Sequence, residues 1–216
     1  MNSPVSESGS TLKACVVLGL FVALSVGLFG ADQWLKVWSF ERLAMLETDD
    51  LVRHATDEQF YIPYHNAIPL VPSVLSLKLT LNHGAVFGLG QGGRWWFVLI
   101  TFFALGIIGY AYYTSYANQW GFRTMLAVIL AGALGNLYDR MLIGAVRDML
   151  WLFPEVKLPF GLSWPSGDSE LYPWIFNLAD VYLCVGIVMV LIMSFISGDP
   201  QAATAKVPAQ EPESSS

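Results

Sequence analysis

The pattern of apolar positions is dominated by four long runs, each of them sufficient for a helix that crosses a lipid bilayer. Such a helix needs about 20 predominantly apolar residues. The third run carries Asp139 and Arg140, and the fourth carries Asp180. We therefore predict an all-α integral membrane protein with four transmembrane helices. The runs cover residues 14–31, 95–116, 124–146 and 174–197.

The first run has a second interpretation, as the apolar core of a cleavable signal peptide. Lys13 precedes it and small residues end it, as in such peptides. The run is longer than a signal-peptide core usually is, and Asp32 and Lys36 continue the same helical pattern. We therefore interpret residues 14–31 as a membrane span.

The order of the runs predicts how the rest of the chain is distributed. Four spans place both termini on one side, and the loops at about 39–94 and 147–173 on the other. The membrane domain then covers 14–197, and we expect the polar ends, 1–13 and 198–216, to be disordered. Basic residues do not settle the orientation, because long loops cross a membrane regardless of their charge.

Within the first outer loop, leucine alternates with polar residues over 73–82. A period of two is typical of a half-buried strand. Prolines precede this segment and glycines follow it, which bounds the strand. The sequence therefore predicts a small β-sheet on the outer face of the membrane.

The composition supports a membrane protein and excludes several classes of function. Hydrophobic residues make up 55% of the 216 residues and charged residues only 13%, against about 25% charged residues in soluble domains. The net charge of −6 offers no basic surface to nucleic acid. We see no metal-ligand cluster or nucleotide-binding loop, so we expect no metal or cofactor. Cys15 and Cys184 lie in apolar runs, and we interpret both as buried core residues.

Charged and amide side chains lie within or beside the apolar runs, where they are costly. Each ionised side chain at the centre of a bilayer costs about 2.5–3.5 kcal/mol on insertion scales. Groups retained at this cost indicate a role in structure or in function. They are Asp32, Lys36, Asn82, Asn136, Asp139, Arg140, Asp148, Asn177 and Asp180.

Two sets of these groups favour a structural role. Asp32 and Lys36 are four residues apart, so they share a helix face and can form an ion pair. Asn136, Asp139 and Arg140 also share a face. Arg140 can neutralise the adjacent carboxylate while its other donors bind backbone or a neighbouring loop. We therefore interpret both sets as structural networks.

Asp148 and Asp180 differ, because they come from the ends of different spans. The third span leaves the membrane on the side where the fourth enters it, so we expect both carboxylates at one face and at similar depth. Two carboxylates close together in a poorly solvated site share a proton near neutral pH. The ionised group can deprotonate a water while the protonated group protonates the carbonyl oxygen of an amide.

The carboxylate pair alone leaves three classes of protein open. A hydrolase would use it as described, a proton- or ion-coupled transporter also places acids in the membrane, and a structural subunit would need it only for stability. The acids gather near one surface, which favours the hydrolase slightly. No G-x-S-x-G or H-E-x-x-H motif supplies another mechanism, and we interpret His83 as incidental.

Four segments, taken together, resemble bacterial lipoprotein signal peptidase (signal peptidase II). The resemblance implies an aspartic peptidase of the bacterial cytoplasmic membrane, with cytoplasmic termini and the active site on the extracytoplasmic face. It also implies prolipoprotein substrates, cut just before a cysteine that carries diacylglyceryl, and contact with membrane lipids. The oligomeric state stays open, with a monomer favoured. The segments are DQWLK (32–36), LNHGAVFGL (81–89), GALGNLYDRMLIGAVRDML (132–150) and FNLADVYLCVG (176–186).

The same resemblance assigns roles by position. The catalytic pair of the family falls on Asp148 and Asp180. The remaining matches would orient this pair, the substrate or the outer loop. These supporting residues are Asp32, Lys36, Asn82, Gly84, Asn136, Asp139, Arg140 and Asn177.

The chain departs from the family pattern by two exchanges and two extensions. Val86 replaces a usual alanine and Met149 a usual phenylalanine, both apolar exchanges. The segment between the two aspartates is longer than usual, with an insertion around 153–173, and the loop at about 40–72 is also extended. We expect these extensions to reshape substrate access more than the chemistry.

Overall fold

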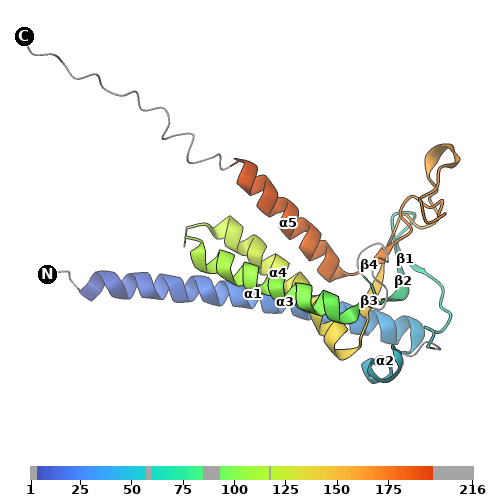
Figure 1. The fold of residues 1–216 in the computed structure, drawn as a ribbon, viewed down its shortest axis with the longest axis horizontal. Coiled ribbons are helices and arrows are strands. Elements are labelled where there is room, and N and C mark those ends of the chain that lie inside the picture. The colour runs from blue at the N-terminus through green and yellow to red at the C-terminus, as the bar shows by residue number, and fades with distance from the viewer. Residues whose placement is uncertain (1–3, 57–59, 85–92, 117, 197–216) are drawn as a thin grey trace, which may run out of the picture.

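The structure is a computed structural model and describes residues 4–56, 60–84, 93–116 and 118–196. Helix α4 packs against the three other long helices (Figure 1). Among the described residues, four helices are long and apolar enough to cross a membrane, which confirms the predicted architecture. These helices are α1 (Pro4–Ala44), α3 (Arg94–Thr114), α4 (Trp120–Leu142) and α5 (Leu178–Ile196).

The first helix is longer than the apolar run that predicted it. α1 begins at Pro4, inside the segment expected to be disordered, and ends at Ala44 in the first outer loop. Proline fits the first turn of a helix, because the N–H group that it lacks has no helical acceptor there. The expected disorder at 198–216 lies outside the described residues.

The third and fourth helices are shorter than predicted at their outer ends. α4 ends at Leu142, because Gly144 has a φ of 98°, a left-handed conformation that terminates helices. α5 begins only at Leu178. Asn177 and Asp180 cap each other there: the backbone N–H of each donates to a side-chain oxygen of the other, at 3.2 and 3.1 Å. Such a reciprocal capping box fixes the start of a helix, so Asp180 lies in the first turn.

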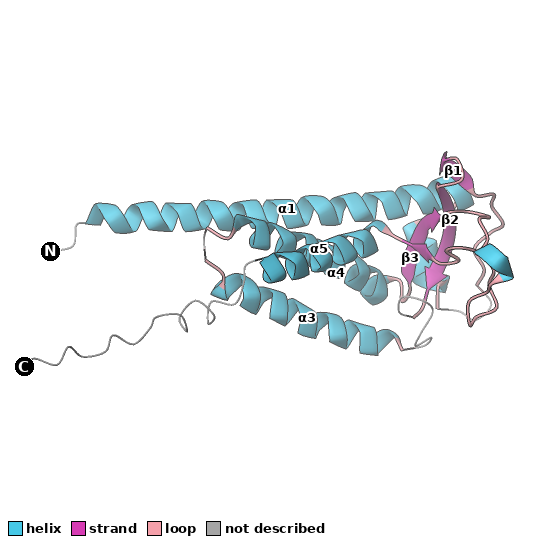
Figure 2. Cartoon of the chain, turned by 90° about the horizontal axis from the view of Figure 1, so that it is seen from above, coloured by secondary structure: helices cyan, strands magenta, loops and turns pink. Residues whose placement is uncertain are grey.

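Four antiparallel strands, in the order β1-β2-β3-β4, form one sheet. Figure 2 shows this sheet beyond the ends of α3, α4 and α5 and beside the last turns of α1, far from the start of α1 and the end of α5. The strand predicted at 73–82 is confirmed as β2, whereas β3 and the short helix α2 (Thr48–His54) were not predicted. The strands are β1 (Ile68–Val71), β2 (Leu75–Asn82), β3 (Val146–Leu152) and β4 (Ile175–Phe176).

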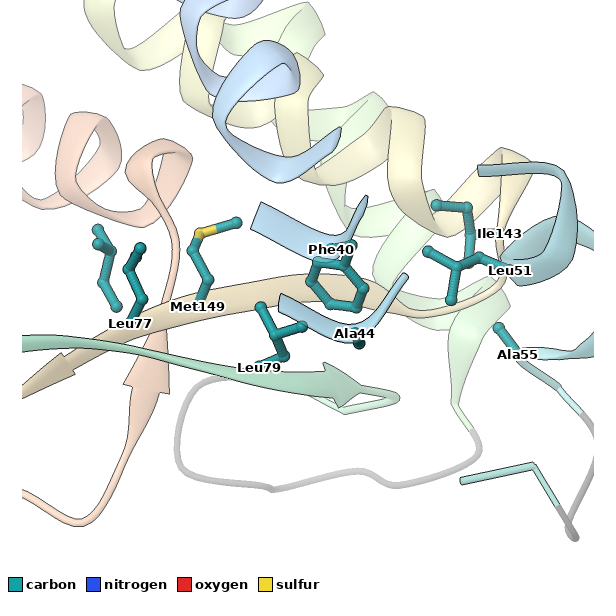
Figure 3. Close-up of a cluster of buried hydrophobic side chains, with 9 residues drawn as sticks. Phe40, Ala44, Leu51, Ala55, Leu77, Leu79, Ile143 and Met149 are labelled. Atoms are coloured by element: carbon teal, nitrogen blue, oxygen red, sulfur yellow. The ribbon is translucent and has the colours of Figure 1, made fainter. Parts of the chain in front are cut away.

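A cluster of buried apolar side chains joins the sheet to the outer end of α1 (Figure 3). Phe40 of α1 and Leu51 of α2 are 1% and 0% exposed, and Met149 of β3 is fully buried. The cluster holds β3 against α1, and therefore fixes the strand that carries Asp148. Its members are Phe40, Ala44, Leu51, Ala55, Leu77, Leu79, Ile143, Met149 and Leu150.

Helices α4 and α5 approach each other closely at Gly132. A Cβ atom at this position would lie 2.5 Å from the carbonyl oxygen of Ala179 and 2.9 Å from Cγ of Leu183. Only glycine permits this separation without displacement of backbone. The contact brings Asn136, one turn further along α4, to the start of α5.

The interpretation of both cysteines as buried core residues was wrong. Cys15 and Cys184 are exposed at the protein surface. A membrane helix carries apolar residues on faces that meet lipid as well as on faces that meet protein. An apolar run therefore does not reveal which of its positions lie in the core.

Candidate active site

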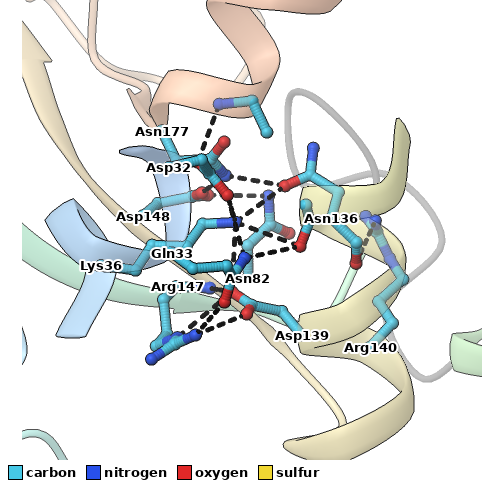
Figure 4. Close-up of polar contacts among 12 residues, drawn as sticks. Asp32, Gln33, Lys36, Asn82, Asn136, Asp139, Arg140, Arg147, Asp148 and Asn177 are labelled. Atoms are coloured by element: carbon cyan, nitrogen blue, oxygen red, sulfur yellow. Dashed lines mark hydrogen bonds and ion pairs between the residues drawn. The ribbon is translucent and has the colours of Figure 1, made fainter. Parts of the chain in front are cut away.

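Four buried charged side chains form a neutral network between α1, α4 and β3 (Figure 4). The ammonium group of Lys36 lies 2.8 Å from a carboxylate oxygen of Asp32, which confirms the predicted ion pair, and 3.3 Å from Asp139. The guanidinium of Arg147 lies 2.7 Å from the other oxygen of Asp139. Each of the four side chains is 0% or 1% exposed. Because removal from water is costly for each charge, all four depend on these partners.

The cation that neutralises Asp139 is therefore not the adjacent Arg140, as the sequence suggested. Consecutive helical residues point in different directions, and Arg140 turns away from the carboxylate. It donates to the carbonyl oxygen of Gly84 at 3.0 Å, and its guanidinium lies 5.2 Å from the ring centre of Phe97. The predicted contact of Arg140 with a neighbouring loop is confirmed. Gly84 contributes its backbone there.

Asp148 lies on β3 and is 1% exposed. Its two carboxylate oxygens accept hydrogen bonds from the side-chain amides of Asn177, at 2.6 Å, and Asn82, at 3.1 Å. The register of β2 shifts between Leu77 and Thr80. This bulge exchanges the two faces of the strand, so that Asn82 lies on the same face as Asp148.

Asp180 is held at the start of α5 by groups from two helices. One carboxylate oxygen accepts a hydrogen bond from the side-chain amide of Asn136, at 2.7 Å, and the other takes part in the capping box with Asn177. The amide of Asn177 also donates to the side-chain oxygen of Asn136, at 3.1 Å. The two asparagines thus form a chain of hydrogen bonds that links Asp148 to Asp180.

Both aspartates line a cavity of about 540 Å³ where the end of α4 and the start of α5 meet the sheet. Thr80, Asn82, Asn136 and Arg140 contribute polar groups to its wall. Much of the remaining lining is apolar and aromatic, and comes from residues 172–176 and from the first turns of α5, which also carry Asp180. The cavity therefore presents polar side chains and apolar surface together.

Burial is the main reason why the pKa of Asp148 differs from its ordinary value. Desolvation, with the nearby charge of Asp180, raises the pKa of Asp148 from 3.8 to about 7, although the amides of Asn177 and Asn82 oppose the rise. A carboxyl group with this pKa exchanges its proton near neutral pH. The prediction that these two carboxylates influence each other at one site is consistent with this arrangement.

Two members of the network were missed by sequence reasoning. The sequence analysis assigned no role to Arg147 or to Gln33. Gln33 accepts a hydrogen bond from Arg147 at 2.8 Å and donates to Asp32 at 3.0 Å. Gln33 stands beside Asp32 within the DQWLK segment, which was the available signal. His83 contacts the carbonyl oxygen of Ala55 at 2.8 Å and is not among the residues that line the cavity.

A metal site is not indicated in the part of the chain that the structure describes. No group of three or more His, Cys, Asp or Glu residues there is arranged to hold a metal ion. That the reaction needs no metal or cofactor stays a prediction.

Comparison with known sequences connects this architecture to one family. Residues 24–196 match the sequence profile described as "Signal peptidase (SPase) II". The chain is 31% identical over 173 residues to the lipoprotein signal peptidase of Latilactobacillus sakei, an alignment that covers 80% of this chain and 91% of the relative. The lipoprotein signal peptidase of Streptococcus pyogenes serotype M1 is 31% identical over 178 residues, with the same two coverages.

Solved structures share the fold. A bacterial membrane enzyme determined by the in meso method superposes with a TM-score of 0.58 at 22% sequence identity, covering 90% of this chain and 95% of that chain. A second bacterial membrane enzyme gives a TM-score of 0.55 at 24% identity, covering 81% and 92%. At these identities the superpositions support the fold alone, namely four membrane helices with a small sheet.

Proposed function

We propose, from the premise that this chain belongs to the signal peptidase II family, that Asp148 and Asp180 together activate the water that cleaves its substrates. Members of the family are aspartic peptidases that remove signal peptides from prolipoproteins. Membership therefore decides against the transporter and the structural subunit.

The observation that carries the proposal is the pair of differently placed carboxylates on one cavity. Asp148 is fully buried and its pKa is raised to about 7, so the protonated form is well populated near neutral pH. Asp180 lies in the first turn of α5, where the partial positive charge of a helix N-terminus attracts an ionised carboxylate. We assign the acid to Asp148 and the base to Asp180.

The hydrolysis then follows from these two protonation states. The carboxylate of Asp180 takes a proton from water as the oxygen attacks the peptide carbonyl, while Asp148 gives its proton to the carbonyl oxygen. The tetrahedral intermediate collapses when the C–N bond breaks and the nitrogen receives a proton from Asp180. The proton on the second hydroxyl returns to Asp148 as the carbonyl of the new carboxyl group re-forms. Both aspartates end in their starting states.

The position of the cavity suggests how the substrate is presented. A signal peptide has an apolar segment that lies in the bilayer, and a diacylglyceryl group also belongs there. The bond between them would reach the end of the helices, where the cavity lies. We propose that the enzyme cuts just before the lipid-modified cysteine, and that it faces the extracytoplasmic side of the bacterial cytoplasmic membrane.

The test is cleavage of a diacylglyceryl-modified precursor in detergent, with the products identified by mass. Asp148→Asn and Asp180→Asn should each reduce cleavage by at least 1,000-fold and remain folded. The matched control, Asp168→Asn, changes an exposed carboxylate of the outer segment and should cleave normally. Near-normal cleavage by either dyad variant would overturn the assignment of the pair. A product cut elsewhere would overturn the proposed position.

A further inference from the structure

The segment at 153–173 is an ordered hairpin that reaches the active-site cavity. Its two arms pair at Lys157 and Glu170, next to backbone hydrogen bonds between 158 and 169 and between 156 and 171. The indole N–H of Trp164 donates to the carbonyl oxygen of Glu170 at 2.9 Å. The insertion is therefore a defined extension of the molecule, and its last residues enter the cavity wall.

Aromatic rings connect this hairpin to the cavity. The ring of Trp164 meets Trp174 edge to face, with centres 4.7 Å apart. Tyr172 meets Trp174 at 5.3 Å and Phe176 at 6.0 Å, also edge to face. Such pairs stabilise a defined ring orientation beyond the effect of burial. Trp164 therefore contacts Trp174, which lines the cavity together with Tyr172.

Tyr172 brings a phenol to the lining of the cavity that also contains both aspartates. Its ring is half-buried, and burial together with Cys184, Asp180 and Asp148 raises its pKa. The hydroxyl therefore keeps its proton and is a hydrogen-bond donor. A peptide substrate held in this cavity brings carbonyl oxygens, which are acceptors, into the space that the hydroxyl and the carboxylates share.

We propose that Tyr172 is a substrate-binding residue, whose hydroxyl donates a hydrogen bond to a carbonyl oxygen of the bound precursor, and that Trp164 positions it. This proposal rests on the proposed function, because it takes the precursor as the occupant of the cavity. The carbonyl can belong to the peptide beside the cut or to an ester of the diacylglyceryl group. The chemistry of recognition is the same in both cases.

The first test compares steady-state cleavage by the wild type and by Tyr172→Phe, which removes only the hydroxyl. One neutral hydrogen bond contributes about a fivefold change in binding, so KM should rise about fivefold while kcat stays within twofold. Tyr61→Phe, which alters a tyrosine that is 80% exposed, should match the wild type. An unchanged KM in Tyr172→Phe would overturn the proposal, whereas failure of the wild type to cleave would overturn the proposed function itself.

Two further measurements separate binding from structure. In the Asp148→Asn background, where cleavage is absent, Tyr172→Phe should weaken binding of the uncleaved precursor about fivefold. A precursor with ether-linked chains lacks ester carbonyls: a persistent effect assigns the bond to the peptide, and a lost effect assigns it to the ester.

Trp164→Leu tests the positioning role. It should raise KM in the wild type but add little in the Tyr172→Phe background, because the two residues act through one hydroxyl. Equal effects of Trp164→Leu in both backgrounds would show that the hairpin acts independently of Tyr172.

Discussion

Replacement of Asp148 by asparagine should stabilise the protein at alkaline pH while it abolishes cleavage. In the unfolded chain the carboxyl group ionises with a pKa of 3.8, and in the folded protein with a pKa of about 7. Below pH 3.8 the group is protonated in both states. Between these values only the unfolded chain ionises, so the stability of the wild type falls as the pH rises. Above pH 7 the deficit is constant.

The size of this deficit follows from the two pKa values. One pKa unit corresponds to about 1.4 kcal/mol, so the rise to about 7 destabilises the fold by about 4 kcal/mol above pH 7. Asparagine removes the deficit but has one acceptor oxygen in place of two, so one amide donor, of Asn82 or Asn177, loses its partner. A buried donor without a partner costs about 1–3 kcal/mol. The net gain for Asp148→Asn at pH 8 is therefore about 1–3 kcal/mol.

The assay is thermal unfolding of the purified protein in detergent, from pH 4.5 to pH 8.5. At pH 8 the Tm of Asp148→Asn should exceed that of the wild type by roughly 3–10 °C. Near pH 4.5 the deficit shrinks to about 1 kcal/mol, so the Tm of the variant should equal or fall below that of the wild type. Asp168→Asn, at an exposed position, should follow the wild type throughout. A difference in Tm that is independent of pH, or that shrinks as the pH rises, would refute the reasoning.

Two further predictions concern the groups that hold the site together. Lys36→Met leaves the buried carboxylates of Asp32 and Asp139 without their shared cation. It should lower the free energy of unfolding by about 3–5 kcal/mol, with Arg53→Met, at an exposed position, as the control. Equal losses in both variants would contradict the network. Gly132→Ala should push α5 away from α4 and reduce both Tm and cleavage, at a cost of about 1–3 kcal/mol. Gly27→Ala on α1, where a Cβ meets nothing within 4 Å, should retain both, and a Gly132→Ala enzyme of normal activity would show that the close approach is not needed.

The sequence was sufficient for the helices and for one strand, because their patterns are local. Four apolar runs predicted the four helices, and the alternation of leucine and polar residues predicted β2. The strand β3 carries no such signal. Six of its seven residues are buried, since one face meets the cavity and the other meets α1, so its apolar residues merge with the end of the preceding run.

Asp32, Lys36 and Asp139 and the ion pair of the first two could be predicted from the sequence, but the arginine that pairs with Asp139 could not. Arg140 follows Asp139 directly, yet neighbouring helical residues project about 100° apart. Arg147 reaches the same carboxylate because the chain turns back at Gly144 and returns as β3. Such a reversal depends on tertiary structure. The capping box of Asn177 and Asp180 was readable from their spacing, and it would have placed the start of α5 correctly.

The buried carboxylates bind the backbone next to each of the two candidate catalytic residues. Asp139 binds both the backbone N–H, at 3.0 Å, and the guanidinium of Arg147, the residue before Asp148. Asp32 accepts the backbone N–H of Ala179, the residue before Asp180, at 2.9 Å. Lys36 joins these two carboxylates. One neutral network therefore fixes the backbone immediately ahead of each aspartate, from two different elements. An apolar core of equal volume would supply packing, but it offers no acceptors for these two N–H groups. The buried carboxylates therefore fix the positions of Asp148 and Asp180 through hydrogen bonds that apolar side chains cannot make.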